Sequence, residues 1–380
     1  MTSRAHEVIL LATLNTKSSE ACYLKKALED RHVHVNMVDI SLSPIPDAVD
    51  HKQQQIESAA AQALATIAGE HSPDHPVVGL GGGTGGDIIL RIMQSLPMEV
   101  AKIIISPLPF DPRAAAADNF IVMIPTVVDL EGLNGTVRSV LGTAAEMIAG
   151  LVAGGPVWLG QAGSIGMTTL GVTRKAAQSI INRLQPRGYE VTTFHANGFG
   201  GAAFARFARE GRLAAAIDMT IHEMTRIQLA GDHAPMPDRF RAAGSLPRIV
   251  LPGGLNFLGL GPLDQIKPAY RRRPHYRHSG HFTHVKLTPE EMTHVASALA
   301  AELNEATGKT LLILPMGGFS HEDRPGGAIE DAALRETSAE CLEAAAIAYD
   351  VQRIDSHIND SATAEIAVRA LLDRQQGDVP

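Results

Sequence analysis

The stretch Val77–Asp87, VVGLGGGTGGD, packs six glycines and one threonine into eight positions, between an apolar run and the helix-like segment IILRIMQSL. Glycine lets the backbone approach a ligand closely and adopt positive φ. A helix start adds unpaired N–H donors and a partial positive charge. Strand, glycine loop and helix in this order therefore predict a site for a phosphate or a carboxylate.

The composition is that of a globular chain built from small residues. At 380 residues it exceeds one ordinary core, so we expect two domains. Hydrophobic residues make up 45% and charged residues 19%, which excludes a disordered chain. Aromatic residues are only 4% and glycine is abundant, which favours α/β layers over an all-β sandwich.

Charge and cysteine content predict the compartment and exclude some partners. The net charge of −8 argues against nucleic-acid binding, which needs a basic surface. The cysteines, Cys22 and Cys341, fit a reducing compartment. The start MTSRAHEVILLATL has too short an apolar run for a signal peptide. The most apolar helical stretch, 140–152, contains Glu146 and falls short of a membrane span. We expect a cytoplasmic protein without membrane or nucleic-acid partners.

Strand-like and helix-like segments alternate, which indicates parallel sheets covered by helices on both faces. The expected strands cover residues 7–13, 34–40, 76–80, 102–106, 121–128, 165–172, 190–195, 214–219, 248–251, 310–314 and 352–354. The expected helices cover residues 18–30, 53–68, 136–151, 174–184, 201–209, 289–304 and 328–349. The segment VAGGPVWLGQAGSIG, at 152–166, breaks this alternation with five glycines and a proline. We therefore predict two Rossmann-like, doubly wound α/β subdomains, 1–160 and 161–380, that face each other across a cleft.

Three more glycine-rich segments follow expected strands: FHANGFGG (194–201), LPGGLNFLGLG (251–261) and LPMGGFSHEDRPGG (314–327). Ligands of open α/β sheets bind outside the carboxyl ends of the strands. Each segment alone could be only a tight turn, but four arranged alike favour a binding site. The predicted substrate-binding residues are His195, Asn197, Gly198, Gly200, Gly201, Gly253, Gly254 and Asn256.

The segment ATLNTKSSE follows the first expected strand. Thr13, Asn15 and Thr16 are of the types that cap helix starts. Lys17 opposes the helix dipole there, which is favourable only if an anion lies nearby. A solvated lysine remains the alternative.

Two familiar nucleotide signatures do not apply. Gly81, Gly83 and Gly86 fit GxGxxG, but the loop follows the third expected strand, and the next strand lacks the acidic residue that binds a ribose. Gly308-Lys309-Thr310 resembles the end of a Walker A loop, but it precedes a strand and lacks the upstream glycine.

Histidines and carboxylates gather in the second half. His275, His278, His281 and His284 stand among arginines in RRRPHYRHSGHFTH (271–284). A spacing of three aligns side chains poorly, so we expect no metal cluster; a basic loop that recruits an anion and a solvated loop both stay open. A scattered acid–imidazole set could transfer protons or hold Mg²⁺: His321, Glu322, Asp323, Asp218, Glu223, His357 and Asp360. His357 and Asp360 could equally tie down the C-terminal loop. We predict His321, Glu322 and His278 as catalytic.

Taken together, the segments ATLNTKSSE, GLGGGTGG, VDLEGLNGTVRSVLGTAAEMIAG, IGMTTLGVT, FHANGFGG, IDMTIHEM, LPGGLNFLGLG, HSGHFTHVKLTPEE, LPMGGFSHEDRPGG and DSHIND resemble one family over nearly the whole chain. This is the Tm-one-like ATP-binding domain family, named after the tomato mosaic virus resistance protein. The resemblance implies two α/β subdomains, a homodimer or higher homo-oligomer, and ATP, with or without Mg²⁺, in the first subdomain. It implies no known reaction.

By this resemblance the family's TLDTK loop falls on Thr13–Lys17 and its glycine loop on Gly81–Gly86. The residues that it implies for the nucleotide are Thr13, Asn15, Thr16, Lys17, Gly81, Gly82, Gly83, Thr84, Gly85 and Gly86. Asn15 and Asn256 stand where the family has aspartates, which removes two carboxylates that could bind Mg²⁺. His278-Ser279-Gly280 replaces HNP, and residues 320–323 replace a less polar stretch. These departures indicate a divergent ligand or substrate.

Three functions are open on this basis. The leading hypothesis is a nucleotide-binding protein that holds the phosphates of ATP on Gly81–Gly86, Thr16 and Lys17. The second is a metabolic enzyme whose cleft accepts a phosphorylated or carboxylated small molecule. The third is a protein-interaction module, suggested by the plant relative, which acts by binding a viral protein.

Overall fold

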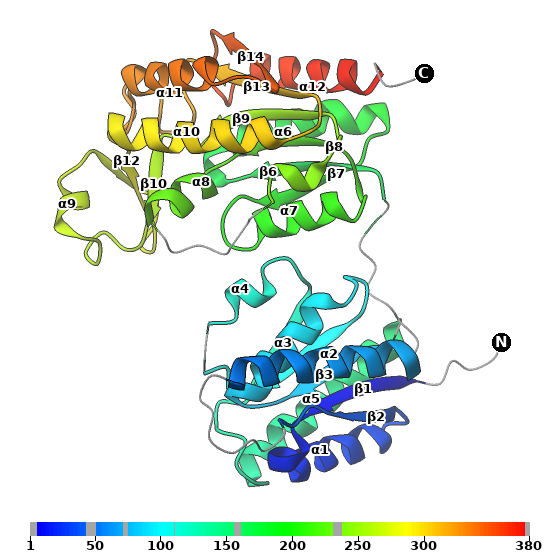
Figure 1. Cartoon of the computed structure of the whole chain (residues 1–380). Helices are drawn as coiled ribbons and strands as arrows, with labels where there is room; N and C mark the ends of the chain where they lie inside the picture. The colour runs from blue at the N-terminus through cyan, green and yellow to red at the C-terminus, as the bar shows by residue number, and fades with distance from the viewer. Residues whose placement is uncertain are drawn as a thin grey trace. The chain divides into compact units, whose positions relative to one another are not determined.

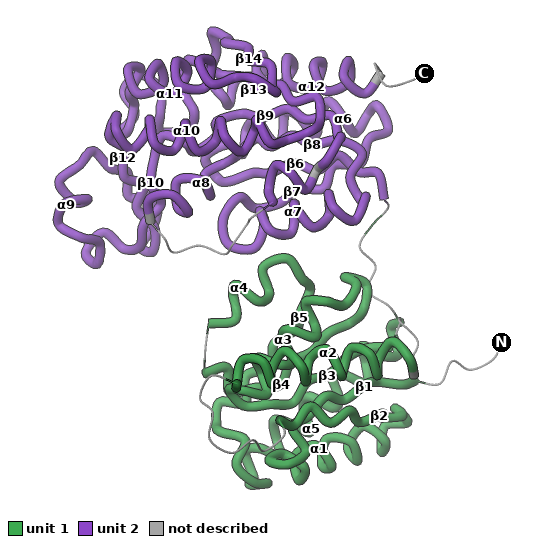
Figure 2. The backbone as a smooth tube through the Cα atoms, viewed as in Figure 1, with its two compact units in different colours: residues 1–160 green, residues 161–380 purple. Residues whose placement is uncertain are grey.

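The computed structural model describes residues 6–42, 51–70, 75–109, 111–155, 160, 162–230 and 238–376. The chain divides into two compact units, residues 1–160 and residues 161–380 (Figure 2). Each unit holds its own parallel sheet with helices on both faces (Figure 1). The predicted class, two Rossmann-like α/β subdomains, is confirmed.

Unit 1 contains a five-stranded parallel sheet in the order β2-β1-β3-β4-β5. Its strands are β1 (Glu7–Ala12), β2 (His34–Asp39), β3 (Val77–Leu80), β4 (Lys102–Ser106) and β5 (Ile121–Pro125). Its helices are α1 (Leu14–Glu29), α2 (Lys52–Glu70), α3 (Gly83–Ser95), α4 (Arg113–Ala116) and α5 (Gly135–Gly154).

The central strand β1 explains why this sheet is covered on both sides. Side chains alternate between faces along a strand, so a run of apolar residues needs two apolar layers. Val8 and Leu10 pack with α1 and α5, whereas Ile9 and Leu11 pack with α2 and α3. Helix α5 is long and apolar enough to cross a membrane, but it buries Val137, Leu141 and Ile148 in this core. It therefore packs as a core helix.

Unit 2 contains a six-stranded parallel sheet in the order β14-β13-β9-β8-β6-β7. Its strands are β6 (Ser164–Thr169), β7 (Val191–His195), β8 (Leu213–Thr220), β9 (Arg248–Gly253), β13 (Thr310–Pro315) and β14 (Tyr349–Ile354). Its helices and short helical turns are η2 (Gly171–Thr173), α6 (Arg174–Leu184), η3 (Gln185–Arg187), α7 (Gly200–Arg209), α8 (Glu223–Thr225), η4 (Arg226–Ala230), η5 (Arg241–Ala243), α9 (Pro268–Arg271), α10 (Pro289–Glu305), α11 (Ala332–Ala344) and α12 (Ser361–Gln376).

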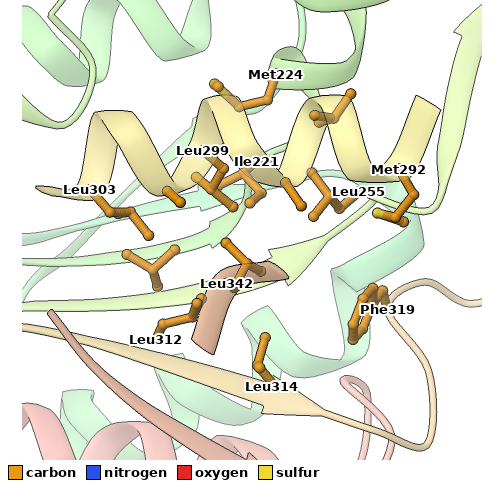
Figure 3. Close-up of a cluster of buried hydrophobic side chains, with 14 of the residues drawn as sticks. Ile221, Met224, Leu255, Met292, Leu299, Leu303, Leu312, Leu314, Phe319 and Leu342 are labelled. Carbon is orange, nitrogen blue, oxygen red and sulfur yellow. The ribbon is translucent and has the colours of Figure 1, made fainter. Parts of the chain in front are cut away.

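Two hydrophobic clusters sandwich this second sheet. One face packs against α6 and α12. The other packs against α10 and α11, where Leu299 and Leu303 of α10 lie over Leu312 and Leu314 of β13 (Figure 3). Apolar side chains therefore cover both faces of the sheet, and Asp218 of β8 and Arg248 of β9 are the buried charged exceptions among its described strand residues.

Three sequence expectations are corrected by the structure. The histidine segment predicted as a loop contributes two strands to a small antiparallel sheet of β10 (Phe257–Leu260), β12 (Thr283–Lys286) and β11 (His275–Arg277). Its pairing partner β10 is distant in sequence, so no local pattern reveals it. The helix expected over 328–349 ends at Ala344, because residues from Tyr349 onward pair with β13 as β14. Helix α12 was not predicted.

Both sheets share one topological feature. The first strand of each unit lies inside its sheet: β1 between β2 and β3, and β6 between β7 and β8. The chain therefore winds outward in two directions from that strand. Crevices form outside the carboxyl ends of strands at such a switch point. Candidate sites are therefore expected after β1 and β3 in unit 1, and after β6, β7 and β8 in unit 2.

Candidate functional site

In unit 1 the predicted glycine loop lies at the switch point. Thr13 follows β1 and Gly81 follows β3, and these strands are neighbours. A Cβ at position 85 would lie 3.3 Å from Cγ2 of Thr13, and one at position 81 would lie 2.9 Å from the carbonyl carbon of Gly85. Larger side chains at these two positions would push the loop apart. The structure thus brings together two segments that the sequence assigned to the nucleotide.

Lys17 already has an anion within the chain. It is buried, and its Nζ donates a hydrogen bond of 2.7 Å to Oε1 of Glu131. The sequence argument correctly required a negative charge near this lysine. The structure supplies that charge from a side chain of the same unit, so Lys17 does not need a phosphate.

The backbone N–H groups of residues 14–17 also have partners within the chain. Leu14 donates to a carboxylate oxygen of Asp39 and Asn15 donates to Oγ of Ser41, at 3.1 and 3.0 Å. The N–H groups of Thr16 and Lys17 both donate to the carbonyl of Thr13. The start of α1 is thus capped by the protein itself.

The start of α3 differs from that of α1. Its N-cap residue, Gly82, offers no side-chain acceptor, and its first turn carries no acidic residue. Among the described residues, nothing accepts from the N–H groups of Gly83, Thr84 or Gly85, whereas Gly86 donates to the carbonyl of Gly82 at 2.6 Å. Three donors without an acceptor among the described residues, and the positive end of the helix dipole, therefore lie at the switch point.

Unit 2 carries a cavity of about 230 Å³ at its own switch point. It is lined from the loops after β6, β7 and β8 and from the small antiparallel sheet. The lining residues are Leu170, Gly171, Val172, His195, Asn197, His222, Arg226, Gly259, His278, Phe282 and His284. Three of the predicted site residues, His195, Asn197 and His278, meet here.

His195 is fixed by the tight turn that follows β7. Its Nδ1 lies 3.1 Å from the carbonyl oxygen of Asn197. Because a carbonyl can only accept, Nδ1 carries the proton and Nε2 keeps its lone pair. A Cβ at position 200 would lie 1.7 Å from the carbonyl oxygen of His195, so only glycine permits this turn. Gly200, a predicted substrate-binding residue, therefore permits the turn that positions His195.

His222 follows β8 and is fixed in the same way. Its ring is buried, and Nδ1 lies 3.1 Å from the carbonyl oxygen of Gly254. A Cβ at position 259 would lie 2.6 Å from Nε2 of His222, so the lining residue Gly259 leaves room for that nitrogen. The predicted Gly254 thus orients an imidazole.

Four rings stack in one column along the cavity wall. The ring centroids of His222 and Phe257 are 4.5 Å apart, those of Phe257 and His284 are 4.1 Å apart, and those of His284 and His278 are 4.9 Å apart. His284 lies between two rings and is only 6% exposed. Burial, with help from the neighbouring His222 and His278, lowers the pKa of His284 to about 3. His284 is therefore a neutral imidazole at physiological pH.

A buried cluster of three charged side chains fixes the segment that carries His222. Arg239 donates to both carboxylate oxygens of Asp218 on β8 and to the carboxylate of Glu223, which follows His222. All three side chains are at most 1% exposed. Burial alone would lower the pKa of the Arg239 guanidinium, but the two carboxylates raise it above its usual value. Glu223 also accepts from the N–H of Gly201, at the start of α7.

The other predicted residues do not line this cavity. The ring of His321 is half exposed and lies 3.6 Å from the carboxylate of Glu322. Asp323 next to them is buried and binds Arg335. Gly198 lies in the turn after β7, Gly201 in the first turn of α7 and Gly253 at the end of β9. Asn256 is buried with an amide that has no partner among the described residues. His321 and Glu322 remain predictions as catalytic groups.

Sequence reasoning missed His222, Arg226 and His284 as site residues. The strand-end rule alone points to His222, because it comes two residues after β8. His284 has no such local signal, since its place depends on the pairing of β12 with β10. In the part of the chain that the structure describes, no group of three or more histidines, cysteines or carboxylates is arranged to hold a metal ion.

Comparisons with family models and with known proteins point to the same family. The model of the uncharacterised protein family (UPF0261) N-terminal domain matches residues 54–155, and that of its C-terminal domain matches residues 163–374. A UPF0261 protein of Clostridium tetani is 27% identical, over 97% of this chain and 99% of the relative. A UPF0261 protein of Rhizobium meliloti is 29% identical, over 96% and 98%. The ToMV resistance protein Tm-1(GCR237) of Solanum lycopersicum is 28% identical, over 84% of this chain and 44% of that protein. The resemblance found in the motifs is confirmed.

The ion cluster yields a stability prediction. Arg239→Met leaves the carboxylates of Asp218 and Glu223 buried without their cation, so the free energy of unfolding should fall by about 3–5 kcal/mol. Urea unfolding followed by circular dichroism measures this loss. The matched variant is Arg241→Met, whose arginine is exposed and pairs with exposed Glu305, and it should change stability by less than about 1 kcal/mol. Similar losses in both variants would contradict the prediction.

His284 yields a pH prediction. Unfolded histidine binds a proton near pH 6.5, whereas folded His284 does so only near pH 3. The unfolded state therefore binds more protons between these values, and stability falls as the pH drops, by up to about 1.4 kcal/mol per pH unit. His284→Phe keeps a ring in the column but cannot titrate, so its unfolding free energy should fall less steeply from pH 6.5 to 4. His294→Phe, on the exposed side of α10, should keep the wild-type slope.

Proposed function

Because the chain belongs to the uncharacterised protein family UPF0261, whose name specifies no reaction, we propose its function from its own residues. We propose that it is an enzyme of small-molecule metabolism that acts on a phosphorylated or carboxylated metabolite in the cavity of unit 2.

The observation that carries this proposal is the convergence of one arginine and four imidazoles on a single cavity. Arg226 is the only permanent cation among the described lining residues, and its Nη1 donates a hydrogen bond of 3.0 Å to the carbonyl oxygen of Gly259 in the same lining. A guanidinium in such a site favours a carboxylate or a phosphate, which it can bind through two N–H groups. The lining therefore suits an anionic ligand.

The size of the cavity, about 230 Å³, fits a small metabolite. The apolar residues Leu170, Val172 and Phe282 form the rest of the wall and would exclude water from the bound molecule.

Arg226 provides the test. Arg226→Met keeps the length of the side chain but removes the cation, so binding of small anions should weaken by roughly 10- to 150-fold, the equivalent of about 1.5–3 kcal/mol for a charged hydrogen bond. Thermal shift and isothermal titration with pyruvate, glycerol 3-phosphate and inorganic phosphate measure this. Arg272→Met, which alters an exposed arginine outside the lining, is the control. Equal anion binding by both variants would refute the proposal.

A second candidate function rests on the start of α3. We propose that the N–H groups of residues 83–85 hold the phosphates of ATP or a related nucleotide, with Thr13 and Thr84 beside them. Support comes from their position at the switch point of unit 1 and from the lack of any capping side chain. Lys17 does not bind the nucleotide in this second proposal, because it is paired with Glu131.

Substitutions at Gly82 can test phosphate binding without disrupting the fold. Space for a side chain is open at this N-cap position. Gly82→Asp would cap α3 with its own carboxylate, so unfolding should cost up to about 1 kcal/mol more while ATP binding is lost. Gly82→Ala adds a Cβ without charge and should keep ATP binding. Isothermal titration with ATP, with and without Mg²⁺, measures the affinity. Absence of ATP binding by the wild type would exclude this second function.

A further inference from the structure

The lining of the cavity in unit 2 narrows the chemistry that it can perform. Among its described residues there is no hydroxyl, thiol, amine or carboxylate side chain. A serine, cysteine or lysine nucleophile is therefore not available there, and the donor set does not form a metal site. What the lining does supply is imidazole, one amide and one guanidinium. Imidazole is the commonest group for moving protons in enzymes.

His195 has the features of a general base. The carbonyl of Asn197 holds its proton on Nδ1, so the lone pair of Nε2 is available. Nothing among the described residues donates to that Nε2. The ring of His195 is exposed, so this nitrogen can be reached by a molecule bound in the cavity.

His284 has the features of a neutral electrophile. Its Nδ1 is buried without a hydrogen-bond partner, and no hydrogen bond to its other ring nitrogen is formed by the described residues. An orphaned buried nitrogen is costly unless a ligand satisfies it. Stacking between Phe257 and His278 fixes the plane of the ring, so only its edge can meet a ligand. A neutral imidazole in this position can donate its N–H to a carbonyl oxygen and stabilise negative charge there.

We propose that the cavity catalyses proton transfer at a carbon next to a carbonyl group, in a small substrate that also carries a carboxylate or a phosphate. Nε2 of His195 takes the proton as the C–H bond breaks, and the electron pair moves onto the carbonyl oxygen, which accepts a hydrogen bond from His284. Arg226 binds the anionic group. The imidazolium of His195 then returns the proton to the same carbon, which exchanges its hydrogen with solvent. In a hydroxycarbonyl substrate it can instead return the proton to the former carbonyl carbon, while the hydroxyl proton of the neighbouring carbon moves to the former carbonyl oxygen, and the outcome is an isomerisation. Neither course needs an oxidant or a reductant.

This inference rests on the proposed function, and hydrogen exchange with solvent separates the two. The protein is incubated in D₂O with dihydroxyacetone phosphate or pyruvate, and proton NMR follows the loss of the C–H signal beside the carbonyl. Glycerol 3-phosphate and lactate carry the same anions without the carbonyl group. All four should stabilise the protein in a thermal shift assay, and only the two carbonyl compounds should exchange.

Two variants test the assigned roles. His195→Gln and His284→Gln should each slow exchange by about 10²- to 10⁴-fold, the usual contribution of a general acid or base. His294→Gln, outside the cavity, should exchange at the wild-type rate. Because His284 is buried, circular dichroism must show that its variant is folded. If the His284 variant does not fold, the His195 variant still tests the proposal, because His195 is exposed.

The outcomes are distinct. Exchange by the wild type that is lost in His195→Gln supports the inference. Thermal stabilisation by the carbonyl compounds without exchange overturns proton transfer and leaves the proposed function standing. Exchange that survives in His195→Gln overturns the assignment of the base. If none of the four anions stabilises the protein, both the inference and the proposed function fail.

Discussion

Arg239 lies between the carboxylates of Asp218 and Glu223, and water reaches none of the three side chains. Charges at this depth are stable only when each is paired, because their desolvation is costly and their mutual attraction must offset it. The cluster therefore fixes the end of β8, the turn that carries His222, and the first N–H groups of α7 relative to one another. The column of stacked rings begins at His222, so the ion cluster also fixes the position of the cavity wall. Although the site is built on loops, these loops are held in place by buried contacts.

The same physical rule determines which anion sites are occupied by the protein and which stay open. Helix starts and buried lysines attract negative charge, and three of them receive it from the chain: the first turn of α1 from Asp39, Lys17 from Glu131 and the start of α7 from Glu223. The start of α3 differs, because its N-cap residue has no side chain that could accept a hydrogen bond. The proposal for unit 1 follows from this contrast, whereas that for unit 2 follows from the arginine and the imidazoles that line one cavity.

The sequence predicted more of the fold than of the site. Apolar runs such as 102–106 and the amphipathic 174–184 are strands and helices with the bounds expected, because burial on one or two faces imposes a period that a short window contains. The glycine loop at Gly81–Gly86 was found for a similar reason, since close packing against Thr13 requires small residues there. The antiparallel sheet that contains His284 was missed, because β10 and β12 pair across more than twenty residues of sequence and β10 is only four residues long.

By itself, then, the sequence determined the two parallel α/β units and the positions of the glycine turns, and it favoured an anion near Lys17 over a solvated lysine. These features depend on the periodicity, size and charge of residues that are close together in the sequence. Only the tertiary structure decided that Glu131 is the anion for Lys17, that His195, His222, His278 and His284 share one cavity, and that Gly200 and Gly254 act by orienting imidazoles. Those facts depend on which strand ends meet and which rings stack, and such contacts join residues that the sequence keeps far apart.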